Sequence, residues 1–495
     1  MLVLRLLGAL AFLAPLALYL ASCGGYPAFW DTGELQTVPY ILGIAHPTGF
    51  PLFTLVGWAF SHALPIGSVA WRMNAMCAFA SAGAAWMAFR VAVRLGAFPP
   101  LALVGAWWFA CGSVVWTRAV RADVHDLALL LATLAIACAL EYHLDGDPRM
   151  LRWSALWFGL GLANHPIALW LAPGLVVVAF ARGRRVEPRA VAACAAIVAA
   201  CLALYAYLPI RSAMVTAAGL DPTRAALGIR GGFLWDYNHP ASWQGFLAEV
   251  SGSQFGAGAT VGAAFDLGAY PGYARFWLGQ AAPELGIVGL ALAAIGIVVA
   301  GARERRAVLG LVLAAFAAVP FAVAFREVEA DVARYFLLSF WLLGVGIGLW
   351  IPSTWFATGT VTERTLAWAT LAVTVIAGVA ALRGNAWIAG LRNDHGAQSV
   401  IDTVRAATPA DAIVVAPWLD ATPLGYAAYV EHSMGRRLIV SAWPDGVARQ
   451  FPQWLRRRPV YLALSGTPQV AGVTLRRVSS AFAPIGVYEV NEAKR

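Results

Sequence analysis

The chain alternates between long apolar stretches and short polar connections. Apolar runs cover residues 3–22, 74–93, 101–116, 127–142, 190–209, 285–302, 308–325, 335–351 and 366–383. Most of them are close to the length at which a helix crosses about 30 Å of hydrocarbon, and a few are slightly short. The pattern predicts an all-α polytopic membrane protein.

Residues 151–181 form an apolar stretch that a single span does not explain. One helix of this length would measure about 45 Å, and two full spans would need about 40 residues. The tripeptide Asn164-His165-Pro166 interrupts the stretch, and proline favours a break. We therefore expect two short helices that turn here near the outer face, which brings the total to about eleven transmembrane helices.

The arginines between the apolar runs predict the orientation of the chain. Alternate connections are basic, and basic connections remain in the cytoplasm. The arginines concerned are Arg90, Arg94, Arg149, Arg152, Arg182, Arg184, Arg185, Arg189, Arg303, Arg305 and Arg306. This pattern predicts a cytoplasmic N-terminus, external loops at about 23–72 and 210–283, and an external C-terminal tail. In a bacterium this would be an inner-membrane protein with a periplasmic tail.

The sequence changes character after about residue 385. Charge rises, and the β-like runs "AIVVA", "RLIVSA", "PVYLALS" and "IGVYEV" alternate with helix-like stretches such as "GAQSVIDTVRAA". Alternation of short strands and helices is typical of a small α/β fold. We predict a transmembrane domain over residues 1–385 and an external α/β domain over residues 386–495.

Composition agrees with a membrane protein. The chain is 60% hydrophobic and 12% charged, with a mean hydropathy of +0.69, and a soluble protein would carry about twice that charged fraction. The net charge of +9 lies largely between apolar runs and forms no basic stripe with interleaved aromatics, so no nucleic-acid partner is expected. The six cysteines lack metal-ligand spacing. Cys23 ends a lipoprotein-like cleavage box, but an uncleaved first helix is favoured because the preceding run is long for a signal core.

The first external loop opens with two acids, Asp31 and Glu34, in "FWDTGEL". A helix that starts at Gly33 would make Asp31 a capping residue and leave Glu34 solvated. Ionisable groups beside an apolar bundle are costly, however, and tend to be functional, so both are candidate catalytic residues. His46 follows as a turn residue or a substrate-binding residue, and the apolar stretch after it predicts a helix at the membrane surface.

A second polar cluster, "TRAVRADVHDLALL", precedes the fourth apolar run. Asp123 is a candidate catalytic acid, and Arg121 and His125 are candidate substrate-binding residues. The alternative is an ion-paired helix start, because an aspartate near a helix N-terminus complements the helix dipole.

Further candidates for substrate binding lie at other predicted outer ends. Arg211 in "YLPIRS" and Arg334 in "DVARYF" either grip a phosphate with the guanidinium fork or extend along the membrane interface. The remaining candidates for substrate binding are His165, in the helix break, and His239, in "WDYNHP".

Several unusual motifs follow one another in the first half of the chain: "WDTGEL", "GIAHPTGFPLFTLVG", "VAWRMNAM", "GLANHP" and "YLPIRS". Together they resemble the membrane glycosyltransferase family that includes a eukaryotic transmembrane protein O-mannosyltransferase, whose bacterial members were long labelled a domain of unknown function. The resemblance implies a GT-C-like bundle, a polyprenyl-phosphate-linked sugar donor and a catalytic carboxylate in the first external loop, a position that Asp31 takes. In the second external loop the family has an "EVY"-like sequence, and this chain has Asp123-Val124-His125 at that position. The resemblance therefore does not establish that the sugar and the acceptor are those of the family.

The expected function is transfer of a sugar from a polyprenyl phosphate in the lipid bilayer to a hydroxyl of protein Ser/Thr, a lipid or a glycan, with inversion and with Asp31 as the base. No cofactor is required by the pattern, although acidic pairs can hold Mg²⁺ or Mn²⁺. One alternative is a lipid or solute transporter or flippase, which predicts charges spread across the membrane midplane. The other is a non-catalytic scaffold, which predicts that Asp31 is dispensable.

Overall fold

The computed structural model describes residues 2–180, 187–229, 233–326, 331–351 and 353–492. Contacts between Cα atoms divide the chain into two compact units. The first unit consists of Met1–Cys23, Cys77–Leu204 and Ser253–Leu391, and the second of Gly24–Met76, Tyr205–Gly252 and Arg392–Arg495. The predicted external loop at about 23–72 and the first part of the predicted loop at about 210–283, up to Gly252, therefore share a unit with the C-terminal segment.

The predicted apolar runs coincide with helices, some of them broken. Among the described residues, seven helical elements are long and apolar enough to cross a membrane, or eight when a pair bent by 71° is included. They are Leu2–Ser22, Val69–Arg94, Val124–Asp145, Pro188–Ala217, Leu267–Phe325, Val332–Leu349 and Val361–Ala407, with Pro99–Ala110 and Ser113–Ala119 as the bent pair. The prediction of an integral membrane protein is confirmed. Of the orienting arginines, Arg182, Arg184 and Arg185 lie outside the described residues.

The predicted break at Asn164-His165-Pro166 is present. Helix α8 (Pro148–Asn164) is followed by the 3₁₀ helix η1 (Pro166–Leu171) and by α9 (Ala172–Phe180). His165 has an extended backbone, and its Nδ1 accepts a hydrogen bond from the backbone N–H of Ile167 at 3.0 Å. The Asn164 amide donates to the Val124 carbonyl at 2.9 Å, so the break is tied to the start of α7 (Val124–Asp145).

The predicted run 101–116 is two helices, α5 (Pro99–Ala110) and α6 (Ser113–Ala119). The buried carboxylate of Glu284, in α15 (Tyr270–Phe316), accepts from Ser113 Oγ at 2.8 Å and from the backbone N–H groups of Val114 and Val115 at 2.7 and 3.1 Å. The first N–H groups of a helix have no acceptor within the helix. Glu284 therefore supplies the cap that a helix starting inside an apolar bundle requires.

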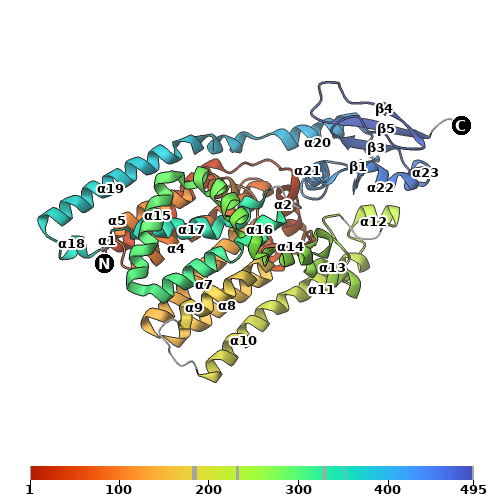
Figure 1. The fold of residues 1–495 in the computed structure, drawn as a ribbon. Helices are drawn as coiled ribbons and strands as arrows, with labels where there is room; N and C mark the ends of the chain where they lie inside the picture. The colour runs from red at the N-terminus through yellow and green to blue at the C-terminus, as the bar shows by residue number, and fades with distance from the viewer. Residues whose placement is uncertain (1, 181–186, 230–232, 327–330, 352, 493–495) are drawn as a thin grey trace. The chain divides into compact units, whose positions relative to one another are not determined.

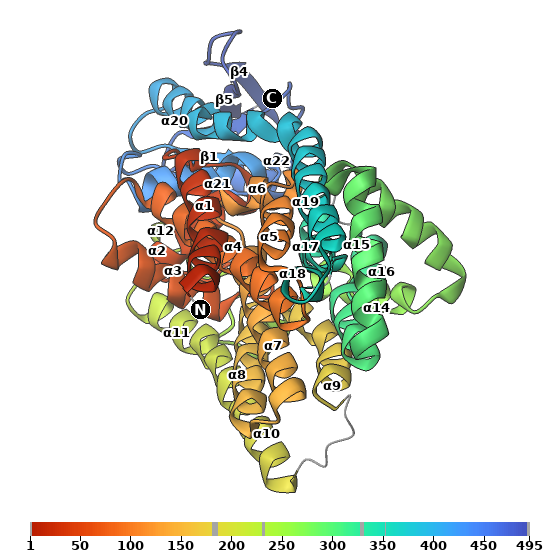
Figure 2. The same ribbon diagram turned by 90° about the vertical axis from the view of Figure 1, so that its left-hand side faces the viewer.

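Helices α5, α15 and α17 (Leu337–Leu349) form the centre of the first unit, with α17 packed on the other two. At the α5–α17 crossing a side chain on Gly105 would place its Cβ 2.3 Å from the Gly344 carbonyl, so the close approach requires glycine, as at many membrane helix crossings. Around this centre α7 packs on α8, and α8 packs on α10 (Pro188–Leu202) (Figure 2). Helix α15 leaves helical geometry at Gly286 and Glu304. The break at Glu304 separates the predicted apolar runs 285–302 and 308–325.

Of the described residues in the two segments that precede the tail, five α-helices lie wholly within the second unit: α2 (Trp30–Ile41), α3 (Pro51–Ala63), α11 (Tyr207–Ala217), α12 (Pro222–Leu227) and α13 (Trp243–Ser251). Helix α2 begins at Trp30 with Phe29 as its N-cap, earlier than the start expected at Gly33. Asp31 therefore lies in the first turn instead of at the cap. Helix α3 falls within the stretch predicted as a surface helix.

The C-terminal segment contains a five-stranded sheet of order β2-β1-β3-β5-β4 (Figure 1). Its strands are β1 (Ile413–Ala416), β2 (Leu438–Ser441), β3 (Val460–Leu464), β4 (Val473–Arg477) and β5 (Gly486–Glu492). Strands β2, β1 and β3 are parallel, and β5 is antiparallel to β3 and β4. The four predicted strands are all present, so the small α/β region is confirmed. The edge strand β4 was not predicted.

Helices cover both faces of this sheet. Alternate residues of β1 point to opposite sides, so Val414 joins the cluster that includes Leu424 of α21 (Trp418–Tyr429), while Val415 joins the cluster of Phe451 and Trp454. Only Pro417 separates β1 from α21. Trp418 therefore lies at the carboxyl edge of the parallel strands, where open α/β sheets commonly present functional side chains.

Candidate functional site

The predicted site residues form one group in each unit. The second unit holds Asp31, Glu34, His46, Arg211 and His239, and the first holds Arg121, Asp123, His125, His165 and Arg334.

In the second unit, Asp31, Glu34 and His46 form a compact cluster. The Glu34 carboxylate is fully buried, its Oε1 accepts from the backbone N–H of His46 at 2.7 Å, and its Oε2 pairs with His46 Nδ1. One ligand atom from each of the three side chains lies within 4.8 Å of the others. Carboxylate and imidazole groups at this spacing are able to hold a divalent cation, although an ion would have to compete with the direct Glu34–His46 contact.

The environment of Glu34 sets its charge. Burial raises the pKa of the Glu34 carboxyl above its ordinary value, the nearby charge of Asp31 raises it further, and His46 opposes both effects. A solvated Glu34, the alternative considered from the sequence, is wrong because the side chain is 0% exposed. The Glu34–His46 pair therefore lies inside the protein, next to the more exposed carboxylate of Asp31.

Aromatic side chains surround this cluster. The Trp418 Nε1–H donates to Asp31 Oδ1 at 3.4 Å. Its ring lies edge-on to those of Phe233, Tyr237 and His46, with centroids 5.4, 5.9 and 6.1 Å away. Sequence reasoning missed Trp418, because nothing local in "VVAPWLD" links it to a loop almost four hundred positions earlier.

Glu249 of α13 is a second buried acid that sequence reasoning missed. Its Oε2 accepts from Asn238 Nδ2 at 3.0 Å, and its Oε1 has no hydrogen-bond partner within the described part of the chain. Burial raises the pKa of Glu249 well above its ordinary value, and Asn238 partly opposes this. An acid inside the apolar helical stretch "FLAEV" was the available signal.

Arg211 binds backbone at the end of α2. Its Nε donates to the Leu42 carbonyl at 2.5 Å and its Nη2 to the Ile41 carbonyl at 3.0 Å. The last carbonyls of a helix lack N–H donors within the helix, so Arg211 joins α11 to the C-terminus of α2. Phosphate binding by Arg211 remains a prediction.

His239 belongs to a network around the buried carboxylate of Asp236. The Asp236 Oδ2 atom lies 2.7 Å from His239 Nδ1 and accepts from Arg224 Nη1 at 2.9 Å. The Ser212 hydroxyl lies 3.1 Å from the same His239 nitrogen. The network connects α11, α12 and the loop before α13, and a substrate contact for His239 remains a prediction.

In the first unit, Asp123 caps α7 and orients His125. Its Oδ1 accepts from the backbone N–H of His125 at 2.9 Å and from His125 Nδ1 at 2.7 Å, and its Oδ2 accepts from Arg118 Nη1 at 3.3 Å. The ion-paired helix start considered from the sequence is therefore present. Because a carboxylate accepts hydrogen bonds, the Nδ1 proton of His125 is directed at Asp123. The Nε2 atom has no partner among the residues that the structure describes.

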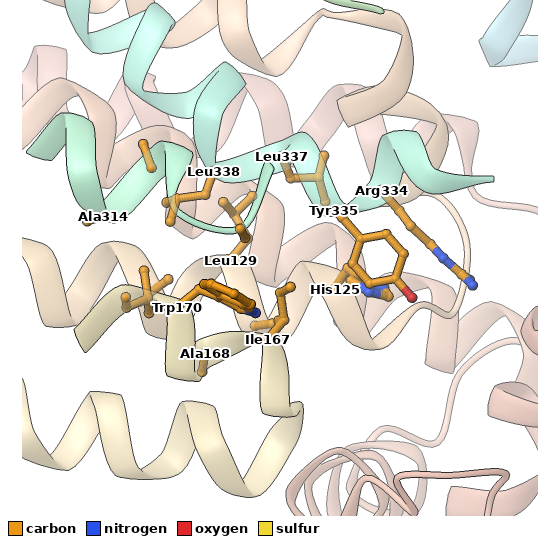
Figure 3. A pocket seen from close by; sticks show the side chains of 15 residues that line it. His125, Leu129, Ile167, Ala168, Trp170, Ala314, Arg334, Tyr335, Leu337 and Leu338 are labelled. Atoms are coloured by element: carbon orange, nitrogen blue, oxygen red, sulfur yellow. The ribbon is translucent and has the colours of Figure 1, made fainter. Parts of the chain in front are cut away.

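His125 also lines a small pocket within the first unit (Figure 3). Arg334 and Tyr335 line the pocket beside His125. The ring centroid of His125 lies 4.7 Å from that of Tyr335 and 4.9 Å from that of His165. The rest of the lining is apolar: Ala128, Leu129, Ala132, Ile167, Ala168, Trp170, Leu171, Ala314, Ala315, Ala318, Leu337 and Leu338. A largely apolar pocket with convergent polar groups at one end suits an amphiphile with an anionic head.

Arg121 lies outside this arrangement. It occupies the bend between α6 and α7, where its backbone N–H donates to the Arg118 carbonyl at 2.9 Å, and it is not among the residues that line the pocket. Its substrate contact remains a prediction.

The fold of the chain is that of a known class of membrane protein. Structures of ArnT from Cupriavidus metallidurans superpose with TM-scores of 0.56 in the apo state and 0.53 with undecaprenyl phosphate bound, at 11% identity and over 97% of both chains. The predicted GT-C-like bundle with a small C-terminal α/β region is confirmed.

Sequence comparison finds similarity over about the first third of the chain. Residues 31–188 match the family described as the Protein O-mannosyl-transferase TMEM260 N-terminal domain, so the predicted resemblance is confirmed over this region. The mouse Protein O-mannosyl-transferase TMEM260 is 32% identical over 146 residues, or 28% of this chain and 21% of the relative. The Dictyostelium discoideum protein of the same name is 25% identical over 170 residues, or 31% of this chain and 21% of the relative. The chain thus spans about a fifth of the length of these curated relatives.

Proposed function

We propose that the chain is a membrane glycosyltransferase that moves a sugar from a polyprenyl phosphate to a hydroxyl acceptor. The similarity to protein O-mannosyl-transferases and the fold shared with ArnT, which was crystallised with undecaprenyl phosphate, support this reaction class.

The observation that carries the proposal is the pocket of the first unit. Its apolar lining is chemically suited to contact isoprenoid units, and the polar end formed by His125, Arg334 and Tyr335 is suited to contact a phosphate. A guanidinium binds phosphate through paired, charge-assisted hydrogen bonds. His125 adds an Nε2 atom without a partner among the described residues, which donates to a phosphate oxygen when the ring is protonated. Together these groups stabilise the charge that develops on the leaving phosphate.

Asp31 has the role of general base in this proposal. The acceptor oxygen attacks the anomeric carbon, the bond from that carbon to the phosphate oxygen breaks, and the electron pair leaves with the phosphate. The acceptor proton passes to the Asp31 carboxylate. A single displacement of this kind inverts the anomeric centre.

We further propose that the reaction takes place on the outer face of a bacterial inner membrane. The arginine distribution supports a cytoplasmic N-terminus. It also supports an external position for the loops at about 23–72 and 210–283 and for residues 386–495. A cysteine placed in the tail, for example Ser465→Cys at an exposed position, is then labelled by a membrane-impermeant maleimide added outside intact cells. Labelling that requires permeabilised cells contradicts this orientation.

The function is tested with purified protein in nanodiscs, a panel of polyprenyl-phosphate sugars and a panel of Ser/Thr peptides, glycans and lipids as acceptors. Mass spectrometry follows each donor. A glycosyltransferase converts one donor into free polyprenyl phosphate and a glycosylated acceptor. A flippase moves the donor between leaflets and leaves it intact, and a scaffold does neither, so donors that remain intact with every acceptor overturn the proposal.

A further inference from the structure

The C-terminal α/β segment contributes a side chain to the cluster around Asp31. Trp418 is the first residue of α21, directly after β1 and Pro417. Its indole N–H donates to Asp31 Oδ1 at 3.4 Å. Catalytic hydrogen bonds are often this long before the substrate binds and shorten in the reacting complex.

Two features bring α21 to this position. Helices α2 and α21 pack against each other. A Cβ on Gly33 would lie 3.0 Å from Thr422 Oγ1 of α21 and 2.2 Å from the Ala28 carbonyl, so the close approach of Ala28 to α2 requires glycine. The buried Tyr426 hydroxyl of α21 accepts from the backbone N–H of Ala70 at 3.0 Å. The start of α21 is therefore fixed to the segment that carries Asp31.

The indole ring is held from three sides. Phe233, Tyr237 and His46 each meet it edge-on, at interplanar angles of 79°, 87° and 88°. Edge-to-face contacts of this kind fix both the position and the tilt of a ring. The Nε1–H vector is thereby held toward Oδ1 of Asp31.

We propose that Trp418 is a positioning residue for Asp31, and that the C-terminal α/β segment acts in the reaction by supplying it. A base is efficient only when its proton-accepting oxygen is correctly oriented, and a hydrogen bond to the carboxylate restrains its rotation. The indole donor contributes this restraint at Oδ1 and favours the unprotonated carboxylate. The inference rests on the proposed function, in which Asp31 is the base.

The kinetic test compares Trp418→Phe with wild type. Phenylalanine keeps an aromatic ring among Phe233, Tyr237 and His46 and removes the N–H. We expect kcat to fall about tenfold, the size of one hydrogen bond to a charged group, with the donor KM unchanged. We also expect the acid limb of the pH–rate profile to move to higher pH, because the unprotonated carboxylate has lost a donor. Trp243→Phe, an exposed tryptophan at the start of α13 in the same unit, is the matched control.

A wild-type kcat and an unshifted acid limb in a folded Trp418→Phe protein overturn the inference while the proposed function stands. A fall in kcat without movement of the acid limb indicates a structural role for the ring and also overturns it.

A second measurement does not depend on turnover or on the phenylalanine variant. Asp31→Cys and Trp418→Cys are combined in the full chain and treated with a short bis-maleimide, and the linked peptides are identified by mass spectrometry, with each single variant as a control. A crosslink is expected whether or not a donor is found, so a crosslink in this variant together with no donor turnover by the wild-type protein leaves the contact intact and removes the proposed function. Absence of the crosslink overturns the contact on which the inference rests.

Discussion

Glu34 and His46 are joined twice across a turn of the chain: the backbone N–H of His46 donates to Glu34 Oε1 at 2.7 Å, and the imidazole pairs with Oε2. Glu34 is 0% exposed, so the pair lies in a medium where an unmatched charge is costly. The contact fixes the "AHPTG" turn against α2.

Removal of the Glu34 carboxylate therefore destabilises the second unit. We expect Glu34→Ala to lower the free energy of unfolding by about 3 kcal/mol, because a backbone N–H and an imidazole both lose a buried acceptor. Glu34→Gln retains one acceptor and costs less. Thermal unfolding in nanodiscs measures both, with the exposed Glu187→Ala as the control. An unchanged Tm in Glu34→Ala contradicts this account of the turn.

Arg334 lines the polar end of the pocket in the first unit. Its replacement by alanine removes a charge-assisted fork, and we expect donor affinity to fall by about 10- to 100-fold with acceptor affinity unchanged. Arg334→Lys retains the charge without the fork and gives an intermediate value. Arg326→Ala, which removes a guanidinium placed 5.5 Å from the Phe276 ring, is the control. Equal donor affinity in Arg334→Ala and wild type would exclude a phosphate contact.

Glu284 caps α6 through three hydrogen bonds. Alanine at this position leaves the hydroxyl of Ser113 and two backbone N–H groups without an acceptor in a buried site. We expect a loss of about 3 kcal/mol or more in the free energy of unfolding, whereas Glu284→Gln keeps one acceptor oxygen and loses less. Equal thermal stability of the alanine variant and wild type would show that α6 does not depend on this cap.

Asp420, in the first turn of α21, is 5% exposed. Burial raises the pKa of Asp420 from 3.8 to about 6. The folded state therefore holds the proton more tightly than the unfolded state. The favourable contribution of the neutral acid is complete below about pH 4 and is lost as pH rises through about 6.

A neutral, non-titrating replacement reports this effect. A shift of about two pKa units corresponds to about 3 kcal/mol, so we expect Asp420→Asn to gain about that much stability relative to wild type between pH 4 and pH 8. The exposed Asp445→Asn serves as the control and shows no such trend. A stability difference between Asp420→Asn and wild type that is constant with pH refutes the burial effect.

The sequence predicted the elements better than their contacts. Apolar runs and the strands of the C-terminal segment are local patterns, and the helix "GAQSVIDTVRAA" coincides with α20 (Gly396–Ala407). Strand β4 was missed because its sequence, "VTLRR", carries two arginines and lies on a sheet edge with little burial. Charged residues are common on such edges, so the strand has no strong hydrophobic alternation.

The candidate site was predictable only in part. Asp31 and Glu34 stood out as acids beside an apolar bundle, and Asp123 as the start of a helix. The contacts of Trp418 with Asp31 and of Glu284 with α6 join positions far apart in the chain. No local pattern encodes such contacts, because the packing of whole helices determines them.

The central claim is that the Asp31 carboxylate takes the acceptor proton. The most direct test compares single-turnover sugar transfer by wild type, Asp31→Asn and the exposed Asp402→Asn, each in nanodiscs with saturating polyprenyl-phosphate donor. Asparagine preserves the shape of the side chain and removes the base, and we expect a rate loss of about 100-fold or more with donor binding intact. Asp402→Asn should transfer at the wild-type rate. Equal transfer by Asp31→Asn and wild type would contradict the account.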